Sequence, residues 1–190
     1  MPKAGKRSIR SGLKKGKAEG ITFHEDTANA ASVIDEYYAV MEETAQRDGF
    51  RPHPKAVYMD LLRTLGPKHA RIFSMRDADD AILCWDFCLV EGIRAQAEYG
   101  ASTEAGRRLR QPPVLDFLAA EYLARDGVRE FDLMGAHSPR CPDLFSVGKY
   151  KIAFASHFTD VPGGWDMPIK KNTYRALRAA KAIKDWRARS

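Results

Sequence analysis

The strongest constraint on the fold lies in residues 70–101, which contain three consecutive segments with the pattern of β-strands. In "AILCWDFCLV" the aromatic side chains of Trp85 and Phe87 fall on one face and Asp86 falls on the other. Short polar turns, "RDADD" and "EG", separate the segments. This pattern predicts a three-stranded antiparallel meander.

Helical periodicity surrounds the predicted meander. Before it, "SVIDEYYAVMEETAQRDGF" and "PKAVYMDLLRTL" repeat apolar residues every three or four positions, and "VLDFLAAEYLARDG" does so after it. Further along, "REFDLM" predicts a strand, the segment around 144–151 a helix, "ASHFTDV" a last strand and "NTYRALRAAKAIKDWRAR" a basic helix. The order predicts an α/β fold with a central mixed, mostly antiparallel sheet flanked by helices.

Charge is distributed unevenly along the chain. Residues 1–17 contain seven Lys or Arg and no acid, and residues 170–190 contain eight with a single acid, so each end carries +7. The whole chain carries only +6, which leaves −8 for the residues between. Clustered positive charge is typical of proteins that bind phosphate-rich partners, but solvated tails have the same composition. Charge alone leaves both interpretations open.

Composition also limits the class of protein. No apolar run is long enough to span a bilayer, and no apolar stretch follows the first basic residues, so we expect a cytoplasmic protein with no membrane span. We expect Cys84, Cys88 and Cys141 to be reduced thiols, and their spacing predicts no metal site.

The length predicts a basic N-terminal segment, residues 1–20, and a single domain, residues 21–190, ending in a basic helix at about 170–190. Four glycines in the first segment disfavour an isolated helix, so we expect this segment to become ordered only against a partner.

Five stretches together resemble a known family: "KRSIRSGLKKGKAEGITFHE", "IDEYYAVMEETAQRDGF", "AEYGAST", "GVREFDLMG" and "LFSVGKYKIAF". In the same order they are similar to the second GNAT-like domain of the FemABX family of aminoacyl-tRNA-dependent peptidyltransferases. The resemblance implies a GNAT-like acyltransferase fold and an enzyme that joins an amino acid carried on tRNA to an amine acceptor. Aminoacyl-tRNA would be a co-substrate, with no other cofactor.

The acceptor implied by the resemblance is a peptidoglycan precursor or a small natural-product intermediate. Family members have two tandem GNAT-like domains, and this chain resembles only the second. The resemblance therefore favours a small acceptor, or a partner subunit in place of the first domain.

The stretch "GRRLRQPPVLDF" indicates which molecule carries the acyl group to the enzyme. GNAT enzymes that use CoA resemble one another in a Gly-rich loop here, whose backbone amides bind pyrophosphate. Pro112 and Pro113 have no N–H group, which argues against a CoA loop. The side chains of Arg107, Arg108 and Arg110 remain suited to binding phosphate.

By resemblance, Lys151 matches the lysine of the family's "FK" element, and Tyr150 matches the aromatic residue before it, which contacts substrate. A cation here stabilises the oxyanion of acyl transfer or holds a phosphate, although Lys151 is equally read as a helix-surface lysine. Asp132 accepts a proton from the amine or caps the following loop, and His137 is a candidate base.

Three residues of the meander are candidates for substrate binding. The resemblance implies that two parallel strands separate near the strand carrying Asp132, and that the loop at 135–143 lines the resulting cleft. Asp86 binds the acceptor amine or faces solvent, and Tyr99 and Ser102 end the third strand near this cleft. The remaining candidates are cations expected to bind tRNA: Lys6, Arg7, Arg10, Lys14, Arg107, Arg108, Arg110, Lys171, Arg175, Arg178 and Lys181.

Two other functions stay open on the sequence alone. One is a CoA-dependent GNAT N-acyltransferase, and the other is a non-catalytic tRNA-binding protein built on the same fold.

Overall fold

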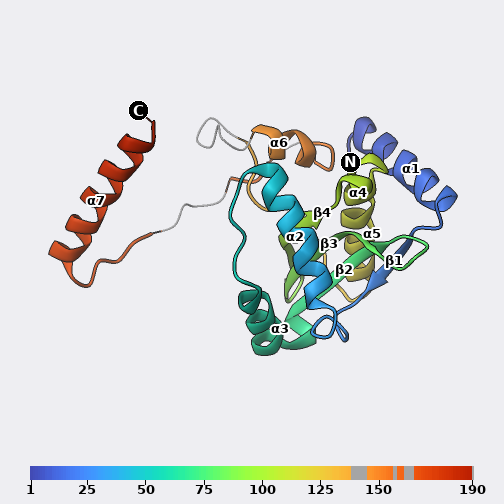
Figure 1. Cartoon of the computed structure of the whole chain (residues 1–190), viewed down its shortest axis with the longest axis horizontal. Coiled ribbons are helices and arrows are strands. Elements are labelled where there is room, and N and C mark those ends of the chain that lie inside the picture. Colours follow the sequence, from blue (N-terminus) through green and yellow to red (C-terminus); the bar gives the residue numbers. More distant parts are fainter. Residues whose placement is uncertain (138–144, 156–157, 161–164, 190) are drawn as a thin grey trace. The chain divides into compact units, whose positions relative to one another are not determined.

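The structure is a computed structural model and describes residues 1–137, 145–155, 158–160 and 165–189 (Figure 1). The chain falls into two units, Met1–His157 and Phe158–Ser190, which are described separately. The first unit contains the sheet and all helices except the last. Among the described residues, no helix combines the length and apolar character that crossing a membrane requires.

One five-stranded sheet organises the first unit, with its strands in the order of the chain. The first three pairings are antiparallel, and the last, between β4 and β5, is parallel. The strands are β1 (Thr22–Glu25), β2 (Ala70–Arg76), β3 (Ile82–Glu91), β4 (Arg94–Ser102) and β5 (Glu130–Asp132). This confirms the predicted meander and the mixed, mostly antiparallel sheet.

Helices cover both faces of the sheet (Figure 1). Among the described residues, six belong to the first unit: α1 (Lys3–Ala18), α2 (Ile34–Asp48), α3 (Lys55–His69), α4 (Glu104–Arg108), α5 (Gln111–Arg125) and α6 (Phe145–Lys151). Helix α7 (Lys171–Arg189) forms most of the second unit. Helix α2 ends where Gly49 adopts a left-handed conformation at φ 74°, as the sequence predicts.

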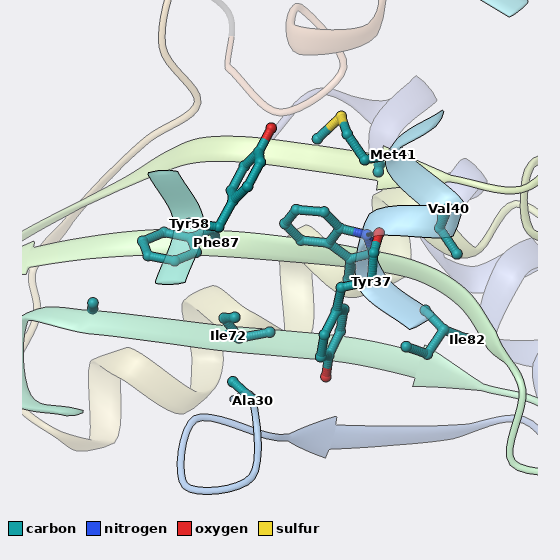
Figure 2. Close-up of a cluster of buried hydrophobic side chains, with 11 residues drawn as sticks. Ala30, Tyr37, Val40, Met41, Tyr58, Ile72, Ile82 and Phe87 are labelled. Carbon is teal, nitrogen blue, oxygen red and sulfur yellow. Dashed lines mark hydrogen bonds between the residues drawn. The ribbon is translucent and has the colours of Figure 1, made fainter. Parts of the chain in front are cut away.

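The alternation of β3 divides the interior into two cores. Trp85 and Phe87 pack with Tyr37 of α2 and Tyr58 of α3, in the cluster that Figure 2 shows. On the opposite face, Cys84 and Cys88 pack against apolar residues of α5. Both thiols are free and buried, as expected, and Cys141 lies outside the described residues.

The sheet opens between its two parallel strands. Pairing of β4 with β5 covers three residue pairs and ends at Gln96 and Asp132, while β4 continues to Ser102. Beyond Gln96, the edge of β4 that would face β5 therefore has no paired strand in the described chain. The edge of β4 is thus open beyond Asp132, where the resemblance implies that the parallel strands separate.

Helix α1 is ordered by packing against its own chain. Gly5, Gly12 and Gly16 lie on its buried face. A Cβ atom at Gly12 would lie 2.5 Å from a methyl carbon of Val114 and 2.6 Å from the carbonyl oxygen of Arg110. The glycines that disfavour an isolated helix thus allow a close approach to α5, and α5 supplies the contact that we expected from a partner.

Three local predictions need correction. The sequence reading missed β1 and α4, which are short and lack a full period of apolar residues. Helix α5 begins at Gln111, so both prolines lie inside its first turn. The last strand, predicted for residues 155–161, is wrong for residues 155 and 158–160, which are not in a strand; its other residues lie outside the described chain.

Candidate active site

The opening between β4 and β5 is bordered by the element that carries the predicted lysine. Helix α6 packs against the segment after β5, because a Cβ atom at Gly148 would lie 2.5 Å from the Cβ of His137. At its other end, α6 approaches α1, where a Cβ at Gly5 would overlap the carbonyl oxygen of Ala153. Helix α6 is thereby held beside the opening. The expected loop at 135–143 is described only as far as residue 137.

Lys151 extends from the end of α6 toward the end of β5. Its Nζ donates a 2.7 Å hydrogen bond to the carbonyl oxygen of Gly135. Burial lowers the pKa of Lys151, while the carboxylates of Asp116 and Asp132 oppose this shift. Lys151 is thus a partly buried cation fixed by a backbone contact rather than a freely solvated surface lysine.

Asp132 ends β5 and accepts a 2.7 Å hydrogen bond from the backbone N–H of Met134. This is the capping role that the sequence left open, and Met134 itself has a positive φ of 65°. The carboxylate is exposed and lies near enough to Lys151 to influence its charge. Asp132 therefore shapes the turn that carries Gly135 and contributes negative charge to the site.

A buried pair of carboxyl groups lies on the α5 side of the opening. Asp86 of β3 is 9% exposed and Asp116 of α5 is 6% exposed. The two carboxyls lie close enough for each to shift the pKa of the other, and the hydroxyl of Tyr150 of α6 donates a hydrogen bond to Oδ2 of Asp116. Figure 1 shows β3, α5 and α6, the elements that supply these three groups.

The environment of the pair favours protonated carboxyls. Burial raises the pKa of Asp86 far above its usual range, and the charge of Asp116 raises it further. Burial also raises the pKa of Asp116, to about 6, although hydrogen bonds from Tyr150 and Asp86 and the charge of Lys151 oppose that shift. Burial and the neighbouring Asp116 raise the pKa of Tyr150, so its hydroxyl keeps its proton.

Gly100 of β4 leaves space for this pair. It lies opposite Asp86 in the sheet, and a Cβ atom there would lie 2.9 Å from Oδ1 of Asp86. Gly100 lies beyond Gln96, in the part of β4 that pairs with β3 but not with β5. The carboxyl pair therefore lies beside the opening. The prediction that Asp86 points away from the aromatic face is confirmed, and the alternative that it faces solvent is wrong.

Asp116 was missed in the sequence. It occurs as one acid within the apolar run "VLDFLAA", where helical spacing places it on the same face as Ala119 and Leu123. An acid on the buried face of an amphipathic helix is the signal that identifies such a residue.

The other meander candidates lie elsewhere. Tyr99 packs its ring against Tyr58 and Phe87, with centroids 5.0 Å and 6.0 Å apart, on the face opposite the carboxyl pair. Ser102 is tied to α2, since its backbone N–H donates to the Thr44 hydroxyl and its carbonyl accepts from Arg47. The structure therefore groups Lys151, Tyr150, Asp132 and Asp86, but not Tyr99 or Ser102. His137 lies against α6.

Two of the three predicted cation groups lie side by side. Arg108 and Arg110 precede α5, and their backbone carbonyls contact α1: Lys15 donates a 3.0 Å hydrogen bond to Arg108, and Gly12 approaches Arg110. The side chains of these arginines and of Arg107 are exposed, as are those on the outer face of α1: Lys6, Arg7, Arg10 and Lys14. The third group, Lys171, Arg175, Arg178 and Lys181, lies exposed on α7 in the separate second unit.

The N-terminus of α5 is not an open anion site. Two of its first three residues are prolines, which supply no N–H donor. Gln111 is fully buried, and its side chain donates to the carbonyls of Gly12 and Leu109. Helix α1 therefore covers the position from which a GNAT enzyme would present amides to a pyrophosphate.

A mixed sheet whose pairing ends early between its two parallel strands, with helices on both faces, is the architecture of the GNAT acyltransferase class. The model of the acetyltransferase (GNAT) domain family matches residues 3–151, so the chain belongs to this family. No curated protein matches the sequence.

Solved structures show the same fold. FemX superposes with a TM-score of 0.68 at 13% identity, over 79% of this chain and 52% of FemX. The C-terminal domain of a putative lysylphosphatidylglycerol synthetase from Agrobacterium fabrum gives 0.58 at 16% identity, over 77% of this chain and 46% of that chain. The chain thus spans about half the length of each of these two solved chains.

A third solved structure is matched over almost its whole length. An aminoglycoside antibiotic 6′-N-acetyltransferase from Acinetobacter baumannii gives a TM-score of 0.54 at 14% identity, over 78% of this chain and 99% of that chain. These identities are low, so the structures establish a FemABX-like GNAT fold and leave the donor and the acceptor to be argued from the site.

Proposed function

We propose that this protein transfers an aminoacyl group from tRNA to an amine. The observation that carries the proposal is the covered N-terminus of α5, where prolines and α1 replace the open amides that would hold CoA. The donor must then be held in another way. The cations of α1 and of residues 107–110 surround the same place, and such cations bind a phosphodiester backbone without reading its sequence.

The chemistry requires few groups, because an aminoacyl ester is already activated. A neutral amine attacks the ester carbonyl, and the negative charge that develops on its oxygen needs a donor. Lys151 is positioned beside the opening by Gly135 and supplies that donor. A positioned cation in a partly buried site contributes about 3 kcal/mol to stabilising such a transition state.

The acceptor belongs to the class of primary amines. We propose as the acceptor either a small amine, such as a natural-product intermediate, or a peptidoglycan precursor that a separate partner subunit helps to hold.

Donor binding by the full chain tests the proposal. We expect aminoacyl-tRNA to bind more tightly than the same tRNA without its amino acid, with affinity falling steeply as salt rises. Arg10→Glu should weaken this binding, whereas Arg63→Glu, the same change on exposed α3, should not. Tight binding of acetyl-CoA without tRNA binding would contradict the proposal. Equal binding of charged and uncharged tRNA would favour a non-catalytic RNA-binding protein.

A further inference from the structure

The proposed reaction leaves one proton without a destination. When the amine nitrogen forms its bond to the acyl carbon, it becomes positively charged and must lose a proton before the bond from carbon to the carrier oxygen breaks. Lys151 is suited to stabilising the oxyanion as a cation, and a cation cannot also receive that proton. Another group beside the opening must accept it.

Asp86 and Asp116 have the geometry of a proton-sharing pair. Both are at least nine-tenths buried, and their carboxyls interact directly. No amide, hydroxyl or cationic group of the described residues donates to Oδ2 of Asp86. A buried carboxylate oxygen without a donor is costly. A proton held between the two carboxyls removes that cost. Two neighbouring buried carboxyls cannot both be ionised, because their negative charges repel.

Tyr150 contacts the pair from the helix that also carries Lys151. Its hydroxyl donates a hydrogen bond to Asp116. The lone pairs of the tyrosine oxygen remain available to accept a proton from a second partner. Tyr150 is adjacent in sequence to Lys151, so both groups reach the site from the end of α6.

We propose that Asp86 and Asp116 together hold one proton in the resting protein and, through the Tyr150 hydroxyl, receive the proton that the attacking amine releases. This inference rests on the proposed function. The amine N–H proton passes to the Tyr150 oxygen as the tyrosine's own proton passes to Asp116. The leaving oxygen of the carrier then takes a proton back along the same route, so the pair ends as it began. Tyr150 is the catalytic residue, and the two aspartates act through it.

The surrounding groups are consistent with this cycle. Cys84 and Cys88 flank Asp86 on β3, and burial raises the pKa of both thiols, so they remain neutral. From α6, Lys151 adds a positive charge near Asp116, and Asp132 of β5 adds a negative charge near Lys151. The pKa of Asp116, about 6, suits a group that must accept and return a proton near neutral pH.

The shared proton is measured without any substrate. Infrared spectra of the full chain, labelled with ¹³C-aspartate, should show the carbonyl band of a protonated aspartic acid at about pH 8, where ordinary aspartates are ionised. Asp86→Asn should abolish the band. Asp126→Asn, the same change at the exposed end of α5, should leave it intact. Absence of the band in the wild type, or its persistence in Asp86→Asn, would overturn the inference.

The relay is measured as a rate. With a donor and acceptor that support transfer, Tyr150→Phe and Asp116→Asn should each lower kcat about 100-fold or more at similar KM. The acid limb of the wild-type pH–rate profile should lie near pH 6. Both variants are nearly isosteric, and circular dichroism should confirm that they fold.

Retention of the wild-type rate and acid limb in both variants, alongside a rate loss in Lys151→Ala, would overturn the relay and leave the proposed function standing. No transfer from any donor would instead overturn the proposed function and, with it, the relay. The infrared band decides separately whether the pair holds its proton.

Discussion

The ammonium of Lys151 donates a 2.7 Å hydrogen bond to the carbonyl oxygen of Gly135, which joins the end of α6 to the turn that follows β5. Both partners lie beside the point where β4 and β5 stop pairing. The contact therefore places a positive charge at the mouth of the opening while leaving Nζ with further N–H donors for a ligand.

Replacement of Lys151 should remove this charge. We expect Lys151→Ala to lower kcat for amide formation by about 100-fold or more, because the oxyanion loses its donor. Lys149→Ala provides the matched control, since Lys149 is exposed on the same helix, and it should keep the wild-type rate. Steady-state rates of both variants check the prediction, and equal rates would remove Lys151 from the mechanism.

The close packing of α1 on α5 should be sensitive to a single methyl group. Gly12→Ala would bring its Cβ within 2.5 Å of Val114 and 2.6 Å of the Arg110 backbone. Overpacking of this kind costs about 1–3 kcal/mol, which exceeds the gain in helix propensity. Chemical denaturation should show a lower free energy of unfolding for Gly12→Ala and little change for Lys14→Ala on the exposed face. A stabilised Gly12→Ala protein would contradict the observed packing.

Acid stability should depend on Asp26. Burial would raise the pKa of this carboxyl, but hydrogen bonds from Ser74 and Tyr37 and the charge of Arg76 outweigh it and lower the pKa below its ordinary value. A lowered pKa contributes stability above the unfolded value, near 3.9, and this contribution disappears as the pH falls through the folded value.

Asp26→Asn should accordingly destabilise the protein at neutral pH and flatten its loss of stability in acid. The control is Asp60→Asn, at an exposed ion pair on α3 that contributes little. Thermal unfolding between about pH 2 and 7 measures both. A wild-type pH dependence in Asp26→Asn would contradict the assignment.

The carboxyl pair of Asp86 and Asp116 should change the stability with pH in the opposite direction to Asp26, so that its contribution falls as the pH rises. The pKa of Asp86 is raised, so the folded protein retains a proton that the unfolded chain loses above about pH 4. Each such proton weakens folding by about 1.4 kcal/mol per pH unit. Asp86→Asn carries no such cost, so its stability relative to the wild type should increase between pH 4 and 8. Denaturation at both pH values measures this, and a constant difference would contradict a raised pKa.

The sequence was most informative for strand β3, whose side chains are buried on both faces of the sheet. The alternation of Trp85, Asp86 and Phe87 correctly assigned a face to each side chain, because a strand repeats every two residues. The resemblance also predicted the opening near Asp132. Neither could predict which candidate residues meet in space, and so Tyr99 and Ser102 were grouped with residues that face elsewhere.

Other features depend on contacts that a sequence does not display. Helix α1 contains residues that disfavour helix formation, and its stability comes from the close approach that glycine permits against Val114. Helical spacing places Asp116 on the buried face of α5, but it does not show which residue of the sheet lies against it. The pairing of two acids from α5 and β3 is a tertiary relationship, and only the folded chain reveals it.

Transfer of a labelled amino acid is the measurement that tests the central claim most directly. The full chain would receive radiolabelled aminoacyl-tRNA and a set of primary amines, with RNase-treated donor and labelled acetyl-CoA in parallel. We predict that label enters an RNase-stable amide only from intact aminoacyl-tRNA. Label transferred from acetyl-CoA, and none from charged tRNA, would contradict the account and identify a CoA-dependent N-acetyltransferase.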